Sequence, residues 1–318
     1  MIRKIKKYIK EKIVMHGVYA NEIKSSKRSK DKMAIILSGE MLVLAHGLEK
    51  GMGLKNSRKG YGKEKARALI DVMLSYAKEY DKKTFAYNES LAILNCYFEL
   101  MKEQKESISE LLEAADPLFT TNEFSNYSAG FKTINMAELM QDSQFDVESF
   151  FSSRHSIRSY SKEEISAEEL NRAIELANMA PSACNRQPVH LYFTSTQSKA
   201  YQFEKLIGGS IGFEGETPYY FCVTVDRLYF SVEESLQWYV NGGIYLAFLS
   251  LALHGLGIGS IILQWRFGTK IEETAKEFLG IPNNEAIVAL VGCGKYLDGD
   301  SKCIEAQRKS VSDTLIMC

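Results

Sequence analysis

The sequence predicts a two-part protein, in which an all-helical module precedes a part of the α+β or α/β class. From Met33 to about Phe145 the apolar residues recur at helical spacing. From Asp146 onward helical patterns alternate with short runs rich in β-branched and aromatic residues. The chain has 318 residues, of which 45% are hydrophobic and 25% charged, so a globular protein with more than one module is expected.

The first 32 residues are predicted to form a basic amphipathic arm and a linker. Ile2, Ile5, Ile9 and Ile13 recur at helical spacing among lysines, a pattern that fits either a helix packed on its own protein or an arm that docks on a membrane surface. This segment holds eleven Lys and Arg against three acidic residues, whereas the whole chain has a net charge of −1. Because the chain as a whole is not cationic, we expect no nucleic-acid partner.

The compartment is predicted to be the cytoplasm. The amino-terminal segment carries charge throughout and lacks the apolar stretch of a secretory signal. The six cysteines show neither C-x-x-C pairs nor the spacing of a zinc set, so we expect free thiols and no metal.

The module at residues 33–145 contains two amphipathic helical patterns, around residues 66–80 and 87–101. Between its first two helices we expect a glycine- and lysine-rich loop, Ala45–Gly62. His46 and Glu49 lie three residues apart there, which fits a structural pair better than a metal site. Three roles stay open. The loop could cover a ligand, it could receive an anionic group, or the whole module could serve only to stabilise the second part.

The second part, residues 146–318, is predicted to alternate helices and strands. An amphipathic helix is expected over Ile165–Ala180. Ser166 opens it and is a good amino-terminal cap. Strands are expected at His190–Thr196, Tyr219–Val225 and Ala286–Gly292, and a long apolar helix at Ser235–Leu253. The apolar stretch from Gly242 to Leu263 is long enough for a membrane span, but its glycines favour a helix that turns into a buried strand. His190 and His254 lie in apolar surroundings and are assigned no role.

Two segments of the second part carry the chemistry. Arg154, His155, Ser156 and Arg158 put two guanidinium groups, an imidazole and a hydroxyl within five residues, a set of donors that suits a phosphate dianion. The second segment has amides, a hydroxyl and prolines, which suit a planar polar ring read by hydrogen bonds. Its residues include Pro181, Ser182, Asn185, Gln187 and Pro188.

Together these two segments resemble the opening of the nitroreductase family of FMN-dependent oxidoreductases. The resemblance continues through Asn241–Ile261 and Val288–Tyr296 into Gln307–Asp313, and covers about residues 152–314. It implies an α+β fold, a three-layer sheet flanked by helices, in a homodimer with FMN at the interface.

The resemblance also implies roles for individual residues. Arg154, His155, Ser156 and Arg158 would hold the FMN phosphate and ribityl chain, and Arg308 would add a second phosphate clamp. Pro181, Ser182, Ala183, Asn185 and Gln187 would reach the isoalloxazine from the other subunit. The backbone of Ile261, Ile262 and Leu263 would face the flavin, where many relatives have a polar or glycine pair, so this wall is expected to be more apolar.

The function implied by the resemblance is hydride transfer from NADH or NADPH through flavin N5 to a small organic acceptor, by a ping-pong mechanism. No side chain need perform the chemistry, because the cofactor supplies it. Two other functions stay open: a flavin-binding sensor or storage protein without turnover, and a membrane-surface adaptor that uses the basic amino-terminal helix.

Overall fold

The computed structural model describes residues 30–54, 58–82, 84–119, 129–130, 145–207, 213–231, 234, 236–265, 270–299, 303–304 and 308–318. The predicted basic arm at residues 1–32 lies outside this part of the chain, except for Lys30–Lys32, which begin the first described helix.

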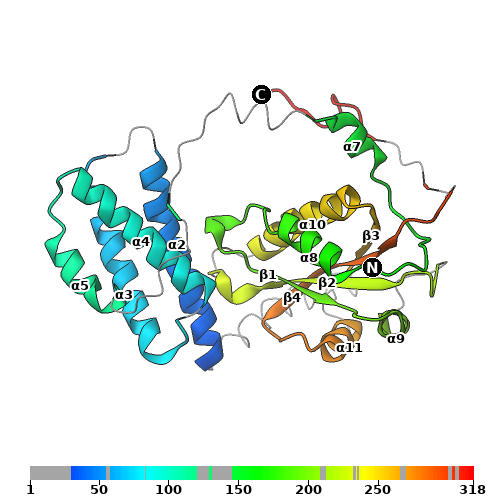
Figure 1. Ribbon diagram of the computed structural model, residues 1–318, viewed down its shortest axis with the longest axis horizontal. Coiled ribbons are helices and arrows are strands. Elements are labelled where there is room, and N and C mark those ends of the chain that lie inside the picture. Colours follow the sequence, from blue (N-terminus) through cyan, green and yellow to red (C-terminus); the bar gives the residue numbers. More distant parts are fainter. Residues whose placement is uncertain are drawn as a thin grey trace, which may run out of the picture.

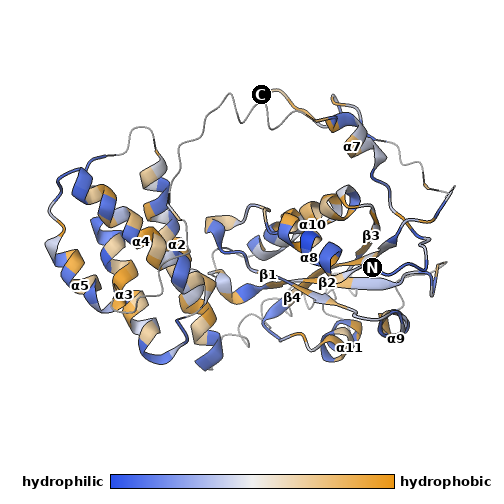
Figure 2. Cartoon of the chain, in the orientation of Figure 1, coloured by the Kyte–Doolittle hydropathy of each residue, from blue (hydrophilic) through white to orange (hydrophobic). Residues whose placement is uncertain are grey.

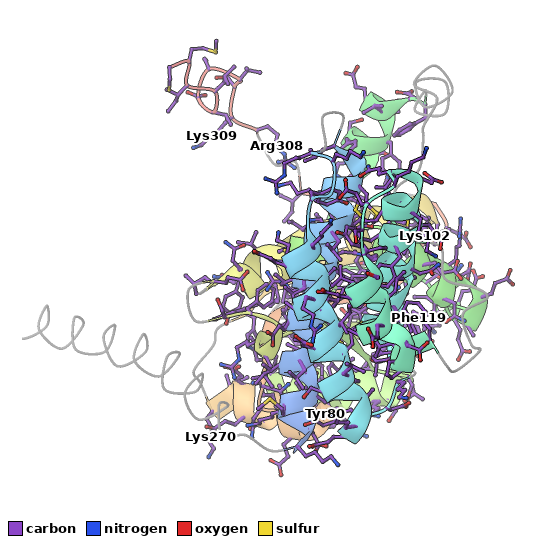
Figure 3. The ribbon with its side chains drawn as sticks, turned by 90° about the vertical axis from the view of Figure 1, so that its left-hand side faces the viewer. Tyr80, Lys102, Phe119, Lys270, Arg308 and Lys309 are labelled. Atoms are coloured by element: carbon purple, nitrogen blue, oxygen red, sulfur yellow. The ribbon has the colours of Figure 1, made fainter. Side chains whose placement is uncertain are left out.

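The helical module is a bundle of α2 (Lys30–Gly53), α3 (Lys63–Glu79), α4 (Phe85–Glu103) and α5 (Ser109–Phe119) (Figure 1). Its apolar faces meet in one core that includes the fully buried Met41, Leu69 and Leu94, and the outer faces are mostly hydrophilic (Figure 2). Figure 3 faces the outer side of the bundle, with Tyr80 after α3 at one end and Lys102 of α4 at the other. The two helices therefore run in opposite directions.

The predicted loop at Ala45–Gly62 is wrong in its first half, because α2 continues to Gly53. Gly51 there serves packing within a helix. A Cβ on Gly51 would stand 2.1 Å from the Tyr61 ring, and the Tyr61 hydroxyl donates to the carbonyl of Leu48 at 2.9 Å. Glycine in this helix therefore makes room for an aromatic side chain, and the tertiary contact outweighs its low helix propensity.

The second part is a four-stranded antiparallel sheet between two layers of helices, which confirms the α+β class and the three-layer expectation (Figure 1). The strands lie in the order β1-β2-β4-β3. The helices α8 and α10 cover one face of the sheet, and α9 and α11 cover the other. The elements are α7 (Val147–Ser153), α8 (Ala167–Ala177), η1 (Ala183–Asn185), β1 (Val189–Phe193), α9 (Gln197–Ile207), β2 (Tyr219–Asp226), η2 (Arg227–Tyr229), α10 (Gln237–Gly255), β3 (Ile258–Gln264), α11 (Lys270–Leu279) and β4 (Glu285–Lys295).

The alternation of side chains along the central strand β2 explains both layers. Tyr219, Phe221 and Val223 pack with α8 and α10, whereas Tyr220 and Cys222 pack with α9 and α11. Every residue of β2 is buried, as expected for a strand covered on both faces.

The predicted helices and strands of this part are confirmed with small shifts of their ends. Ser166 caps α8 in a reciprocal box with Glu169, as its position predicts. The apolar stretch after Gly242 divides into α10 and β3, joined by a turn in which Gly257 has a φ of +70°. None of the helices in the described part of the chain combines the length and the hydropathy that a membrane span requires.

The helical module packs against one end of the sheet part, through contacts of α2 with η1 and η2. Tyr229 of η2 joins the core of the bundle. A Cβ on Gly39 of α2 would stand 3.0 Å from the carbonyl oxygen of Tyr229, so the two parts approach each other closely at this point. The contact places the module directly beside the loop that contains η1.

Candidate functional site

The arginine segment, residues 154–158, runs along the start of β3 at the margin of the sheet. The amide of Ile157 donates to the carbonyl of Ser260 at 3.0 Å, and Ser156 forms a parallel bridge with Ser260. Ile157 and Tyr160 are buried anchors, whereas Arg154, Ser156 and Arg158 are half-buried and His155 is exposed. The backbone is thus fixed by apolar anchors, and the polar side chains between them lie at the surface, where an anion can reach them.

Strand β3 forms the edge of the sheet next to this segment. It pairs with β4 on one side, and beyond the Ser156 bridge no described strand pairs with its other side. Along it Ile261 is buried and Ile262 is 44% exposed. The backbone of Ile261–Leu263 therefore lies at an open edge, where a ligand can pair with it, and Ile262 adds an exposed apolar side chain there. That this backbone faces a flavin stays a prediction.

The amide loop, which we define as residues 181–187, has an unusual backbone. Cys184, Asn185 and Gln187 have φ values of 53°, 51° and 46°, in the left-handed region that non-glycine residues seldom adopt. Such strain persists only where surrounding contacts hold it, and it is common at ligand sites. Here Asn241 of α10 accepts from the amide of Ala183 at 2.8 Å, and Ser182 Oγ accepts from the amide of Gln187 at 3.0 Å.

The anchor of the amide loop is Arg186, which sequence reasoning missed. Its side chain is 2% exposed, lies over the Phe230 ring, and donates to the carbonyls of Ala183 and Tyr229. It also makes a two-point ion pair with Glu234. The hydrogen bond from Arg186 lowers the pKa of Glu234 to about 2. The buried guanidinium of Arg186, paired with the carboxylate of Glu234, therefore holds the loop in place from the interior.

The two halves of the predicted flavin site lie at opposite ends of α10. At the helix start Asn241 holds the amide loop, and at its end the ring of His254 bonds the Ser153 hydroxyl at 2.9 Å, next to Arg154. With a rise of about 1.5 Å per residue, Asn241 and His254 stand about 20 Å apart along the helix axis. A single chain thus does not bring the arginine segment and the amide loop together.

A cavity of about 300 Å³ lies beside the amide loop. The sheet part lines it with hydroxyl and amide groups, and the helical module adds one aromatic ring. The lining residues include Phe85, Asn178, Pro181, Ser182, Gln187 and Tyr245. Within it the Tyr245 hydroxyl donates to Asn178 Oδ1 at 2.9 Å. A cavity of this size with a few polar groups on an apolar lining is typical of a small-molecule site.

The expectation that His190 lies in apolar surroundings is wrong. Its Nδ1 lies 3.0 Å from Oε1 of the buried Glu285, and its pKa is raised, mainly by this hydrogen bond. Glu285 also accepts from the hydroxyls of Tyr192 and Thr224. Glu285 lies 95 positions from His190 and meets it only across the folded sheet, so residue spacing carries no signal of this network.

The remaining predicted residues fall as follows. His46 Nδ1 and Glu49 Oε2 lie 3.3 Å apart on α2, and among the described residues no group of three or more potential ligands could hold a metal ion. Arg308 lies on the exposed terminal segment, outside the body formed by the sheet and its helices (Figures 1 and 3). Its assignment as a second phosphate clamp stays a prediction.

The fold is that of a three-layer α+β protein, and the two segments of its candidate ligand site lie at the two ends of one helix. The sequence model of the family described as Nitroreductase family matches residues 151–218, which include both the arginine segment and the amide loop. The predicted resemblance to this family is thereby confirmed.

Individual relatives cover about half of the chain. A curated protein of Archaeoglobus fulgidus, whose name proposes an NADH dehydrogenase/NAD(P)H nitroreductase, is 26% identical over 147 residues, which is 44% of this chain and 80% of the relative. Among solved structures, an FMN-dependent nitroreductase of Clostridium difficile is 21% identical, with 52% of this chain and 94% of that chain covered and a TM-score of 0.43. A nitroreductase of Bacteroides fragilis with bound FMN is 19% identical, with 55% and 100% covered and a TM-score of 0.46.

Proposed function

We propose that the protein is an FMN-dependent oxidoreductase that transfers hydride from NADH or NADPH to a small organic acceptor, such as a nitro compound or a quinone, by a ping-pong mechanism. One observation carries the proposal: the family match at residues 151–218 spans both the arginine segment and the amide loop. The first presents half-buried polar side chains on a fixed backbone, and the second is a strained loop beside a cavity. The relative from Archaeoglobus fulgidus supports a nicotinamide donor through its name.

The residues present fit FMN. The guanidinium groups of Arg154 and Arg158 and the hydroxyl of Ser156 are half-buried on a fixed backbone, as a phosphate site requires. His155 completes this set, and Arg308 would add its charge from the terminal segment. The amide loop of the other subunit would offer the side chains of Asn185 and Gln187 and the backbone of Pro181–Ala183 to the isoalloxazine, and the edge backbone of Ile261–Leu263 would also face it. The bound flavin would supply the hydride-accepting centre. The protein would orient the nicotinamide donor and then the organic acceptor against it.

The division of the site supports a homodimer. A second copy with its α10 antiparallel to the first would bring the amide loop of one chain to the arginine segment of the other. The outer face of α10 suits this contact, because Val240 and Phe248 are 51% and 37% exposed and Ala247 between them is small and exposed. Apolar side chains on one open face of a helix favour burial against a partner.

All six cysteines are free, which supports a reducing compartment such as the cytoplasm.

The test is reconstitution and turnover. The purified protein is expected to be yellow or to become so with FMN, and NADH or NADPH should bleach the flavin without oxygen. Initial rates with a quinone should give parallel double-reciprocal plots, as a ping-pong mechanism requires. A protein that stays colourless with FMN contradicts the proposal, and one that binds FMN but is not reduced is a flavin-binding sensor or storage protein instead.

A further inference from the structure

Helix α4 of the helical module presents one face to the amide loop. Phe85 and Glu89 stand four residues apart, so their side chains leave the same side of the helix. Phe85 lines the cavity together with Pro181, Ser182 and Gln187. Glu89 Oε1 accepts a hydrogen bond from Asn185 Nδ2 at 3.5 Å. Both contacts cross between modules to the same short loop.

The contact with Glu89 completes a directed chain of side-chain hydrogen bonds. Gln187 Nε2 donates to Asn185 Oδ1 at 3.0 Å, and Asn185 Nδ2 donates in turn to Glu89. Because an amide has one accepting and one donating end, these two bonds fix which way the Asn185 side chain faces. They also link two of the three residues of the loop that have left-handed backbone.

The surroundings of Glu89 are unfavourable for a carboxylate. Its side chain is half-buried between the modules, and in the part of the chain that the structure describes it forms no ion pair. Burial raises the pKa of Glu89, and the carboxylate of Glu49 on α2 raises it further, against the lowering effect of Asn185. A leucine here would avoid this cost, so the carboxylate is explained better by its bond to the loop than by packing.

We propose that Glu89 is a positioning residue of the flavin site, through which the helical module orients the amides of Asn185 and Gln187 toward the isoalloxazine. The inference rests on the proposed function and gives the helical module a part in it. The module then acts on the cofactor through α4, and its contribution is more than stabilisation of the fold.

The test compares variants of the full-length protein in FMN titrations and flavin absorption spectra. Glu89→Leu removes the acceptor, and we expect about 3- to 10-fold weaker FMN binding, as for one lost hydrogen bond, with shifted absorption bands. Glu89→Gln keeps an accepting oxygen and should bind FMN within about twofold of the wild type. The matched control is Glu99→Gln on the same helix, where the carboxylate is 59% exposed and paired with Lys102, and it should change neither property.

A Glu89→Leu variant with the affinity and spectrum of the control would overturn the inference. Equal losses in Glu89→Gln and Glu89→Leu would also overturn it, because the bond would then be irrelevant. If Glu89→Leu does not fold, Asn185→Asp replaces the donor with a second carboxylate, and adding Glu89→Gln should restore part of the lost affinity through a reversed bond. No restoration contradicts the inference. A wild type that fails to bind FMN refutes the proposed function and this inference with it, whereas a yellow wild type with unaffected variants refutes the inference alone.

Discussion

Arg186 and Glu234 form a two-point ion pair beneath the amide loop, with Nη1–Oε2 and Nη2–Oε1 distances of 2.9 and 2.5 Å. The guanidinium is almost fully buried, whereas a third of the Glu234 side chain is exposed. Arg186 lies in the interior beneath the amide loop, and Glu234 lies at the surface in the segment before α10. The ion pair therefore connects these two places. Its carboxylate gives the stability of the loop a dependence on pH.

Glu234→Gln is expected to lower the thermal stability of the protein and to remove one acid-sensitive component from it. Arg186 lowers the pKa of Glu234 from an ordinary value of about 4.3 to about 2. The stabilisation is therefore fully present above the ordinary value and is lost as the pH falls toward 2. The difference in melting temperature between wild type and variant should be largest above about pH 5 and should shrink toward pH 2. A difference that does not change with pH would contradict this role.

Arg154→Ala should weaken FMN binding by about 1.5 to 3 kcal/mol, the usual range for a hydrogen bond to a charged group. Fluorescence titration of the apoprotein with FMN measures the change. Lys162→Ala removes an exposed cation from the same stretch of chain, outside the predicted contact, and should change binding by less than about 0.5 kcal/mol. Equal effects of the two substitutions would show that only the overall charge matters.

Ala247→Glu should prevent dimer formation and with it the retention of FMN. Ala247 lies on the exposed outer face of α10, so the new carboxylate does not disturb the core of its own chain, but it would be buried unpaired in the proposed interface. Leu246 is less suitable because it packs partly against the core. The control is Ser198→Glu. Ser198 is an exposed residue of α9, which covers the face of the sheet opposite α10, so this substitution should leave the dimer intact. Sedimentation analysis decides, and a variant that stays dimeric and yellow contradicts the proposed interface.

Gly39→Leu should loosen the contact between the helical module and the sheet part. Any side chain at this position of α2 meets the backbone of Tyr229 at about 3.0 Å, and backbone cannot yield as a flexible side chain can. We expect a loss of about 1 to 3 kcal/mol in the free energy of unfolding, as for other overpacked contacts. Gly53→Ala, where nothing lies within 4 Å of the added Cβ, should leave stability nearly unchanged. Chemical denaturation of both variants measures the difference.

The sequence predicted the helices and strands of the sheet part well because their signals are local. Ser166 and Glu169 define a helix start within four residues, and the glycines after α10 separate it from β3. The continuation of α2 to Gly53 was missed, since Tyr61 fills the space at Gly51 only after the chain has folded back. Likewise, Arg186 and Glu234 are 48 positions apart, so no pattern in the sequence joined them.

The distance between the two ends of α10 has a consequence for mixed dimers of two different variants. If each flavin site takes its arginine segment from one chain and its amide loop from the other, an Arg154 variant and an Asn185 variant carry defects in different halves. A mixed dimer of the two then has one doubly altered site and one in which both halves are wild type. Two variants with weakened FMN binding, denatured and refolded together in equal amounts, should regain wild-type affinity at about a quarter of the sites by such complementation between subunits.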